Sequence, residues 1–162
     1  TPLGQVRFDN EMEGSVHGLE LWGNHEVSPS WRLSGGLLLL KTHLRPKPGS
    51  TDPLGPSALG NDPRHQWMLR SAHDLSPRHE LDIMMRHVGH LSNPKVPAYT
   101  AIDFRFGWRI HRTLELSLLA TNLFDRSHPE FSALESVYAG IGSVETRSEL
   151  ERGIYLKLVW QL

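Results

Sequence analysis

Apolar and polar side chains alternate with a period of two along much of this chain, most plainly at its carboxyl end. Ile154, Leu156, Leu158, Trp160 and Leu162 occupy every second position there, and mostly polar residues lie between them. Successive side chains of a β-strand point to opposite faces of a sheet, so the pattern predicts a strand that runs to the last residue. A transmembrane β-barrel needs such an ending, because its last strand must pair without a frayed tail. A soluble sheet can end in the same way.

The same period recurs upstream, and no segment shows a sustained helical period with caps. On residues 99–110, Phe104, Phe106 and Trp108 share one face, and Asp103 and Arg105 lie on the other. The pattern predicts an all-β fold, an antiparallel up-and-down meander of about seven or eight strands. The predicted strands span residues 5–10, 15–27, 31–45, 64–75, 79–91, 98–110, 114–124 and 151–162.

The predicted connections alternate between tight turns and mostly longer segments. Alternate connections of a meander fall at the same end of the sheet, so one end carries the turns and the other carries the long loops. This asymmetry is typical of outer-membrane barrels, which have short periplasmic turns and longer outer loops. The tight turns are 28–30, 76–78 and 111–113, and the other connections are 46–63 and 125–150, a modest one at 91–96 and a short one at 9–14.

Three tryptophans give an independent check of this arrangement. Trp31 follows a predicted turn, Trp108 precedes another, and Trp160 lies near the terminus, which the meander places at the same end. By parity all three lie on the apolar face of their strands. An indole ring suits the boundary between acyl chains and water, so the three residues are predicted to form part of a membrane girdle. The alternative is three core tryptophans in a soluble sandwich, although a sandwich core gives no reason for their equal height.

Composition excludes several classes of protein and leaves a membrane barrel open. The 17 basic and 18 acidic residues give a net charge of −1, so no basic excess indicates nucleic acid and no acidic excess indicates disorder. The longest apolar run, Leu37 to Leu40, is far shorter than the roughly 18 residues of a membrane helix. The mean hydropathy of −0.37 suits barrel strands, whose apolar residues alternate with polar ones.

Charged residues gather by parity on the face opposite the apolar one. In a membrane barrel this face lines the lumen, because an Arg or Lys on the lipid side costs about 2–4 kcal/mol at midplane. We expect wall residues that are paired with one another and make some contacts to a plug or to cargo; a solvated face is the simpler alternative. The predicted lumen-facing wall includes Glu20, Arg86, Asp103, Arg105, Arg109 and Lys157, and the wider set adds Arg70, Asp82 and Glu115.

No enzyme, cofactor or dedicated metal site is expected. The chain has no Gly-x-Ser-x-Gly nucleophile motif, no Gly-rich phosphate loop and no cysteine. Among the ten histidines, His87 and His90 lie on opposite faces of a predicted strand, and His17 and His25 lie about 27 Å apart along another. Scattered histidines of the lumen, rim and loops are the expected interpretation.

Four segments, in order along the chain, resemble the C-terminal part of a TonB-dependent outer-membrane receptor. Residues 18–21 (Gly-Leu-Glu-Leu), after Asn10, resemble its Asn … Gly-Val-Glu-Leu strand. Residues 97–103 resemble its Pro-x-Tyr … Asp strand, and residues 120–125 contain its Asn-Leu-Phe-Asp strand end. Residues 152–160 resemble the closing strand. The chain departs from the pattern at its last residue, where Leu162 stands in place of the usual Phe, and at Lys157, where a small or polar residue is common.

The resemblance implies that residues 1–162 are the closing part of a 22-stranded transmembrane β-barrel, without the plug domain or the TonB box. It implies an outer-membrane import receptor of a Gram-negative bacterium, most often for a ferric siderophore or other iron complex, with haem, cobalamin or a sugar as other cargoes. The implied partners are the protein's own plug domain and remaining barrel strands, TonB, outer-membrane lipid and a small iron chelate, with no nucleic acid.

Cargo contacts are predicted in the two long loops and their edges, because the long loops of a receptor meet its ligand. Ordinary loop positions without a ligand are the alternative. The residues predicted to bind ligand are Arg64, His65, His128, Glu130, Phe131 and Tyr138.

Two other functions remain open at the level of sequence. One is a soluble lipocalin-like barrel, in which the apolar face turns inward around a small ligand. The other is a small outer-membrane barrel with a structural role. Alternation is the same in all three cases; the loop asymmetry, the level tryptophans and the four ordered segments favour the receptor.

Overall fold

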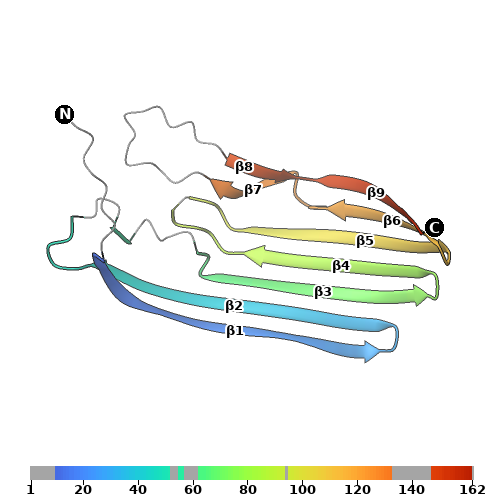
Figure 1. Ribbon diagram of the computed structural model, residues 1–162, viewed down its shortest axis with the longest axis horizontal. Helices are drawn as coiled ribbons and strands as arrows, with labels where there is room; N and C mark the ends of the chain where they lie inside the picture. The colour runs from blue at the N-terminus through green and yellow to red at the C-terminus, as the bar shows by residue number, and fades with distance from the viewer. Residues whose placement is uncertain (1–9, 52–54, 57–61, 94, 133–146, 162) are drawn as a thin grey trace.

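The computed structural model describes residues 10–51, 55–56, 62–93, 95–132 and 147–161. They form a seven-stranded antiparallel sheet, in the order β1-β2-β3-β4-β5-β6-β9, and a separate β7-β8 hairpin (Figure 1). The strands are β1 (Met12–Ser28), β2 (Trp31–Pro46), β3 (His65–Ser76), β4 (His79–Val88), β5 (Tyr99–His111), β6 (Leu114–Thr121), β7 (Ser127–Ser132), β8 (Arg147–Glu151) and β9 (Gly153–Trp160).

The strand order confirms the predicted up-and-down meander. Two-residue turns after β1, β3 and β5 lie at one end of the sheet, and β9 ends beside them (Figure 1). The longer connections lie at the opposite end. We call these the turn end and the loop end.

Two predicted elements differ from the structure. The predicted strand 5–10 lies outside the described residues except for Asn10, which belongs to no strand. The prediction of a plain loop over 125–150 is wrong in part, because β7 and β8 pair within it. Pro129 lacks a backbone donor and a register shift follows it, so this short hairpin carries no alternating signal that would mark it as strand.

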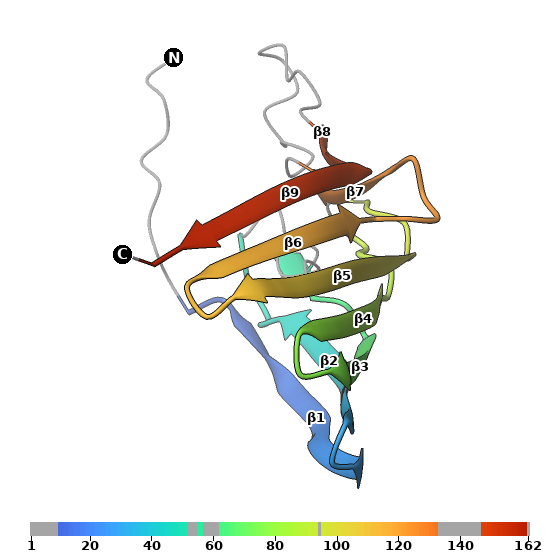
Figure 2. The same ribbon diagram turned by 90° about the vertical axis from the view of Figure 1, so that its right-hand side faces the viewer.

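The register assigns every strand residue of the large sheet to one of two faces. The apolar face holds rows such as Leu33, Ser71, Ile83, Phe104, Ala120 and Ile154. The charged face holds the alternate rows, such as Ala72, Asp82, Arg105 and Leu119. The sheet is curved rather than flat (Figure 2), as a right-handed strand twist requires.

Within the described residues, the large sheet carries no second layer over its apolar face. Among the described residues the only buried apolar side chains are Val96, Ala101 and Ala120, and of these only Ala120 lies on the apolar face. Ile154 and Leu156 are both 71% exposed, and Leu158 is 63% exposed. The sheet therefore has no dry core of its own. No helix formed by the described residues has the length and apolar character needed to cross a membrane.

The β1-β2 hairpin extends further at the loop end than the neighbouring strand β3. β3 begins at His65, which pairs with Leu39, and only Arg64 continues the ladder, through a bond from Leu40 N–H to its carbonyl. Beyond that point residues 12–17 of β1 pair with residues 41–46 of β2 alone. We call this two-stranded extension at the loop end the projecting ribbon.

Candidate functional site

Ion pairs link five consecutive strands across the charged face near the turn end. Every member belongs to an alternating strand position, so the pleat of the sheet directs all of them to the same side. We call this group the charged wall; it consists of Arg32 on β2, Arg70 and Asp74 on β3, Glu80 and Asp82 on β4, Arg105 and Arg109 on β5, and Glu115 on β6.

Arg105 is the centre of the charged wall. Its Nη1 lies 3.1 Å from both Glu80 Oε2 and Asp82 Oδ2, and its Nη2 lies 2.8 Å from Glu115 Oε1. The Asp82 carboxylate also accepts from Arg70 at 2.5 Å. One guanidinium thus joins carboxylates of the two strands on either side of its own, a geometry that the fixed fork of Arg donors allows and a lysine would not reproduce.

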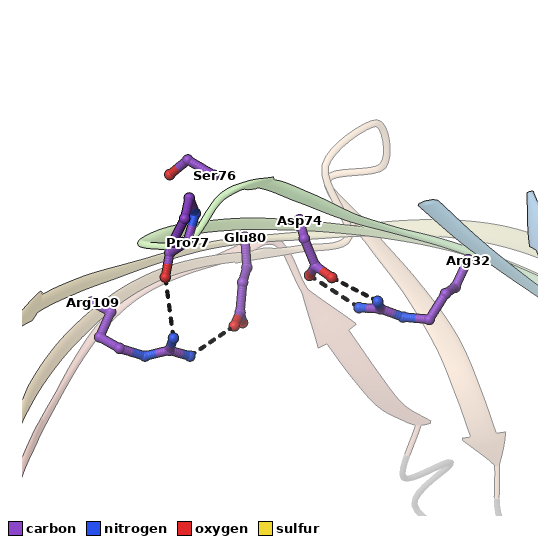
Figure 3. Close-up of a pocket in the computed structure, with 6 residues that line it drawn as sticks. All are labelled: Arg32, Asp74, Ser76, Pro77, Glu80 and Arg109. Atoms are coloured by element: carbon purple, nitrogen blue, oxygen red, sulfur yellow. Dashed lines mark hydrogen bonds and ion pairs between the residues drawn. The ribbon is translucent and has the colours of Figure 1, made fainter. Parts of the chain in front are cut away.

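Two further pairs face each other across a shallow pocket at the turn end (Figure 3). Arg32 makes a two-bond contact with Asp74, at 2.6 and 3.0 Å. Arg109 donates to Glu80 at 3.1 Å and to the Pro77 carbonyl at 3.2 Å. In Figure 3 these side chains point to the side toward which the neighbouring strands bend. The charged face is therefore the concave face of the sheet.

The charged wall has no net charge, because its four guanidinium groups balance its four carboxylates. A wall of this kind presents polar atoms to water without attracting ions of one sign over a distance. Each pair is partly exposed, so water screens it and its contribution to the stability of the sheet is small. The arrangement suits a surface in contact with water.

The six residues predicted to line a lumen share this face by register. Arg86, Asp103, Arg105 and Arg109 are ion-paired as expected. Glu20, opposite Leu38, and Lys157, opposite Ser117, are exposed and lie outside the charged wall. That they meet an aqueous lumen stays a prediction.

A second polar cluster lies on the charged face at the loop end. Arg86 bridges Asp103 at 3.2 Å and Glu130 of the β7-β8 hairpin at 3.1 Å. Glu130 also bonds His128 Nε2 at 3.2 Å, and the His128 ring stacks on Tyr99 with centroids 4.1 Å apart. We call this group, with Asn122, the hairpin anchor, because it ties the outer hairpin to β4 and β5.

Asn122 turns the chain out of the large sheet toward that hairpin. Its φ of 56° is left-handed, a conformation that asparagine tolerates better than most residues. Its backbone N–H donates to Asp103 Oδ1 at 2.9 Å, and its side-chain amide donates to the Leu150 carbonyl at 3.1 Å. Tyr99, Asp103 and Asn122, which carried the sequence resemblance, therefore have a shared structural task at the root of one loop.

The residues predicted to bind ligand do not form one group. His128 and Glu130 belong to the hairpin anchor, and His128 is only 4% exposed. Arg64 precedes β3, and His65 lies on the apolar face, on the other side of the sheet. Phe131 is in β7, but its side chain is not among those described, and Tyr138 lies outside the described residues. A cargo role for any of the six stays a prediction.

Aromatic residues form a band at each end of the apolar face. At the turn end Trp31 stacks on His73 and Trp108 stacks on His79, with centroids 5.5 and 6.1 Å apart. At the loop end His87 stacks on Trp67. Trp160 is the last residue of β9, so the three tryptophans predicted to share one end do so. The histidine partners were missed, because they face the tryptophans across strands rather than along the chain.

No three His, Asp or Glu side chains of the described segments come together in a way that could hold a metal ion.

No protein-family model matches the chain. The catecholate siderophore receptor Fiu of Escherichia coli strain K12 is 26% identical over 123 residues, which cover 70% of this chain and 16% of the receptor. The same receptor from strain UTI89 matches to the same extent.

Solved structures agree on the fold. The siderophore receptor PiuA from Acinetobacter baumannii superposes with a TM-score of 0.72 at 19% identity, over 91% of this chain and 22% of the receptor. The closed form of the ferric-catecholate import receptor Fiu from E. coli K12 superposes with a TM-score of 0.67 at 22% identity, over 88% and 20%. The chain is partially homologous to siderophore receptors.

This homology confirms the predicted resemblance to TonB-dependent receptors, and the superposition confirms an antiparallel meander that aligns with part of a receptor. The homologues are receptors, not enzymes, as expected. The chain spans only about a fifth, or less, of the length of these relatives.

Proposed function

We propose that residues 1–162 are the closing part of the transmembrane barrel of a TonB-dependent receptor that imports a ferric siderophore. The observation that carries the proposal is a single-layered sheet with two chemically opposite faces. One face exposes Leu, Ile, Phe and Trp side chains, and the other holds the charged wall. A single layer with such faces is stable where acyl chains meet one face and water meets the other.

The spacing of the two aromatic bands supports a membrane on the apolar face. On β4 the bands lie at His79 and His87, eight residues apart and therefore about 27 Å along the strand. At the usual strand tilt of about 40° this corresponds to roughly 20 Å of height, close to the apolar band of outer-membrane barrels. Leu81, Ile83 and Met85 fill the interval on that face.

The concave position of the charged face supports an aqueous lumen over a soluble lipocalin-like barrel. A lipocalin-like barrel would require the apolar face on the inside. In the proposed receptor, β1 and β9 pair with strands elsewhere in the full-length protein, and a plug domain lies against the charged wall. TonB, which energises transport, contacts a part of the receptor outside this chain.

The names of the relatives support the cargo. Fiu is a catecholate siderophore receptor and a ferric-catecholate import receptor. We therefore propose a ferric catecholate as cargo and the outer membrane of a Gram-negative bacterium as the location. Iron arrives already chelated, so the barrel needs no iron ligands of its own.

The test is uptake by the full-length protein. It is expressed in a Gram-negative strain that lacks its own catecholate receptors, and uptake of a radioactive ferric catecholate is measured with and without TonB. We expect TonB-dependent uptake of the catecholate and much slower uptake of a ferric hydroxamate. Uptake that is independent of TonB, or a protein recovered only in the soluble fraction, contradicts the proposal.

A further inference from the structure

Two histidines meet at the loop end of the apolar face. His65 is the first residue of β3 and His87 lies on β4, so they are diagonal neighbours across the β3-β4 pair. Their rings are nearly parallel, with an interplanar angle of 14° and centroids 5.4 Å apart. Their Nε2 atoms are 3.4 Å apart, which is long for a hydrogen bond between two rings.

These distances fit two imidazoles that share one metal ion. Two nitrogens that bind a tetrahedral ion at about 2.0–2.1 Å lie about 3.3–3.4 Å apart, and the centres of two converging, coplanar rings are then about 5.3 Å apart. The observed separations are 3.4 and 5.4 Å. Both rings thus already have the spacing that a shared ion would require.

A neighbouring threonine hydroxyl forms a hydrogen bond with the His87 ring. Thr100 Oγ1 lies 2.8 Å from His87 Nδ1, opposite His87 on β5. When the hydroxyl accepts the Nδ1 proton, His87 Nε2 is left with a free lone pair, which is the tautomer of a metal ligand.

Gly89 makes room for the other ring. A Cβ at this position would lie 3.0 Å from His65 Cε1 and 2.9 Å from the His65 carbonyl oxygen. The Gly89 N–H also donates to that carbonyl at 2.9 Å. A side chain at position 89 would displace the His65 ring from its present place.

We propose that His65 and His87 bind one divalent transition-metal ion of the Zn²⁺, Ni²⁺ or Cu²⁺ type, with water completing its coordination. Neutral imidazole suits these ions, whereas Mg²⁺ and Ca²⁺ prefer oxygen. The ion would join the start of β3 to the end of β4 at the loop end of the sheet. Neither histidine belongs to the charged wall or the hairpin anchor, but His87 is part of the loop-end aromatic band, so the site rests on the proposed membrane face and not on the identity of the cargo.

The test uses the full-length protein in detergent, titrated with Cu²⁺ and followed by calorimetry and by electron paramagnetic resonance. We expect one equivalent with hyperfine structure from two nitrogens. H65Q and H87Q should each weaken this equivalent at least tenfold, and H65Q/H87Q should remove it. T100V, which leaves both ligands in place, should weaken it by about tenfold, as loss of a supporting hydrogen bond does.

The control is H73Q, at the turn end of the same face, which should leave binding unchanged. Heat-modifiable migration on gels verifies that each variant is folded. The proposal is overturned if folded H65Q/H87Q keeps the full stoichiometry of the unmodified protein, if H73Q removes the same equivalent, or if the spectrum shows a single nitrogen ligand.

Discussion

Consecutive residues of β4 and β5 meet opposite surroundings. Phe104 and Ile83 pair on the apolar face, where no described residue covers them. One residue away, Arg105 and Asp82 pair on the charged face, and further ion pairs join them to Arg70 on β3 and Glu115 on β6. The charged wall thus completes its interactions within the sheet, whereas the apolar face has no covering layer among the described residues. The predictions that follow compare the two faces, beginning with the largest expected effect.

An arginine on the apolar face should be the most damaging change. Ile83→Arg places a charge near mid-height of β4, where the cost in lipid is about 2–4 kcal/mol. Met84→Arg, at the next position, points to the charged face, where it lies between Asp103 and Arg70, and should cost less than about 1 kcal/mol. Urea unfolding of the full-length protein in lipid vesicles measures both. Equal costs would contradict the assignment of the faces.

Removing the centre of the charged wall should have the next largest effect. Arg105→Met leaves the carboxylates of Glu80, Asp82 and Glu115 without a shared cation, and we expect a loss of about 1–3 kcal/mol in the free energy of unfolding. The matched control is Arg45→Met, which breaks the exposed Arg45–Glu13 pair of the projecting ribbon. That variant should change stability by less than about 0.5 kcal/mol. If Arg45→Met lowers the free energy of unfolding as much as Arg105→Met does, the charged wall stabilises the protein no more than an isolated exposed ion pair.

The hairpin anchor should respond to the backbone of Asn122. Asn122→Ala forces a left-handed φ on an alanine and loses the bond to Leu150, at a cost of about 1–2 kcal/mol. Asn122→Gly loses the bond alone and should cost less. Hydrogen exchange of the β7-β8 amides measures the effect: exchange should be fastest in the alanine variant. If the glycine variant exchanges as fast, the left-handed backbone is not the cause.

The smallest expected effect concerns the aromatic bands. Trp108→Leu should destabilise the protein in vesicles by less than about 1 kcal/mol and remove part of the fluorescence quenched by brominated lipid. Trp22 lies on the charged face and is 77% exposed. Trp22→Leu should leave the intensity that brominated lipid quenches unchanged and remove only unquenched fluorescence. The opposite result for the two variants would reverse the faces.

Period-two alternation was sufficient to predict the meander, since most of its signal comes from strands that are apolar on one side only. The clearest case is β5, in which one face carries Phe104, Phe106 and Trp108 and the other carries Asp103, Arg105 and Arg109. The register continues the same two faces into β4 and β6. The short β7-β8 hairpin was not predictable in this way, because Pro129 and the bulge interrupt any period.

The side-chain pairs within each face could not be predicted from the sequence either. The hairpin anchor joins Arg86 to Glu130, and Tyr99 to His128, across residues that are far apart in the chain. His65 and His87 are separated by 22 positions and meet only because of the β3-β4 register. Spacing along one strand, which is how the histidines were first compared, carries no information about such cross-strand neighbours.

The projecting ribbon gives the molecule an uneven rim. Among the described residues, positions 41–46 of β2 pair with β1 and have no strand on the β3 side, so bending or fraying there breaks fewer hydrogen bonds than in the sheet and leaves the ion pairs of the charged wall intact. Bending of residues 12–17 and 41–46 should therefore cost less free energy than bending of the sheet that continues from them. The loop end of the sheet therefore combines a more flexible projecting ribbon, formed by β1 and β2, with a shorter and stiffer edge at β3.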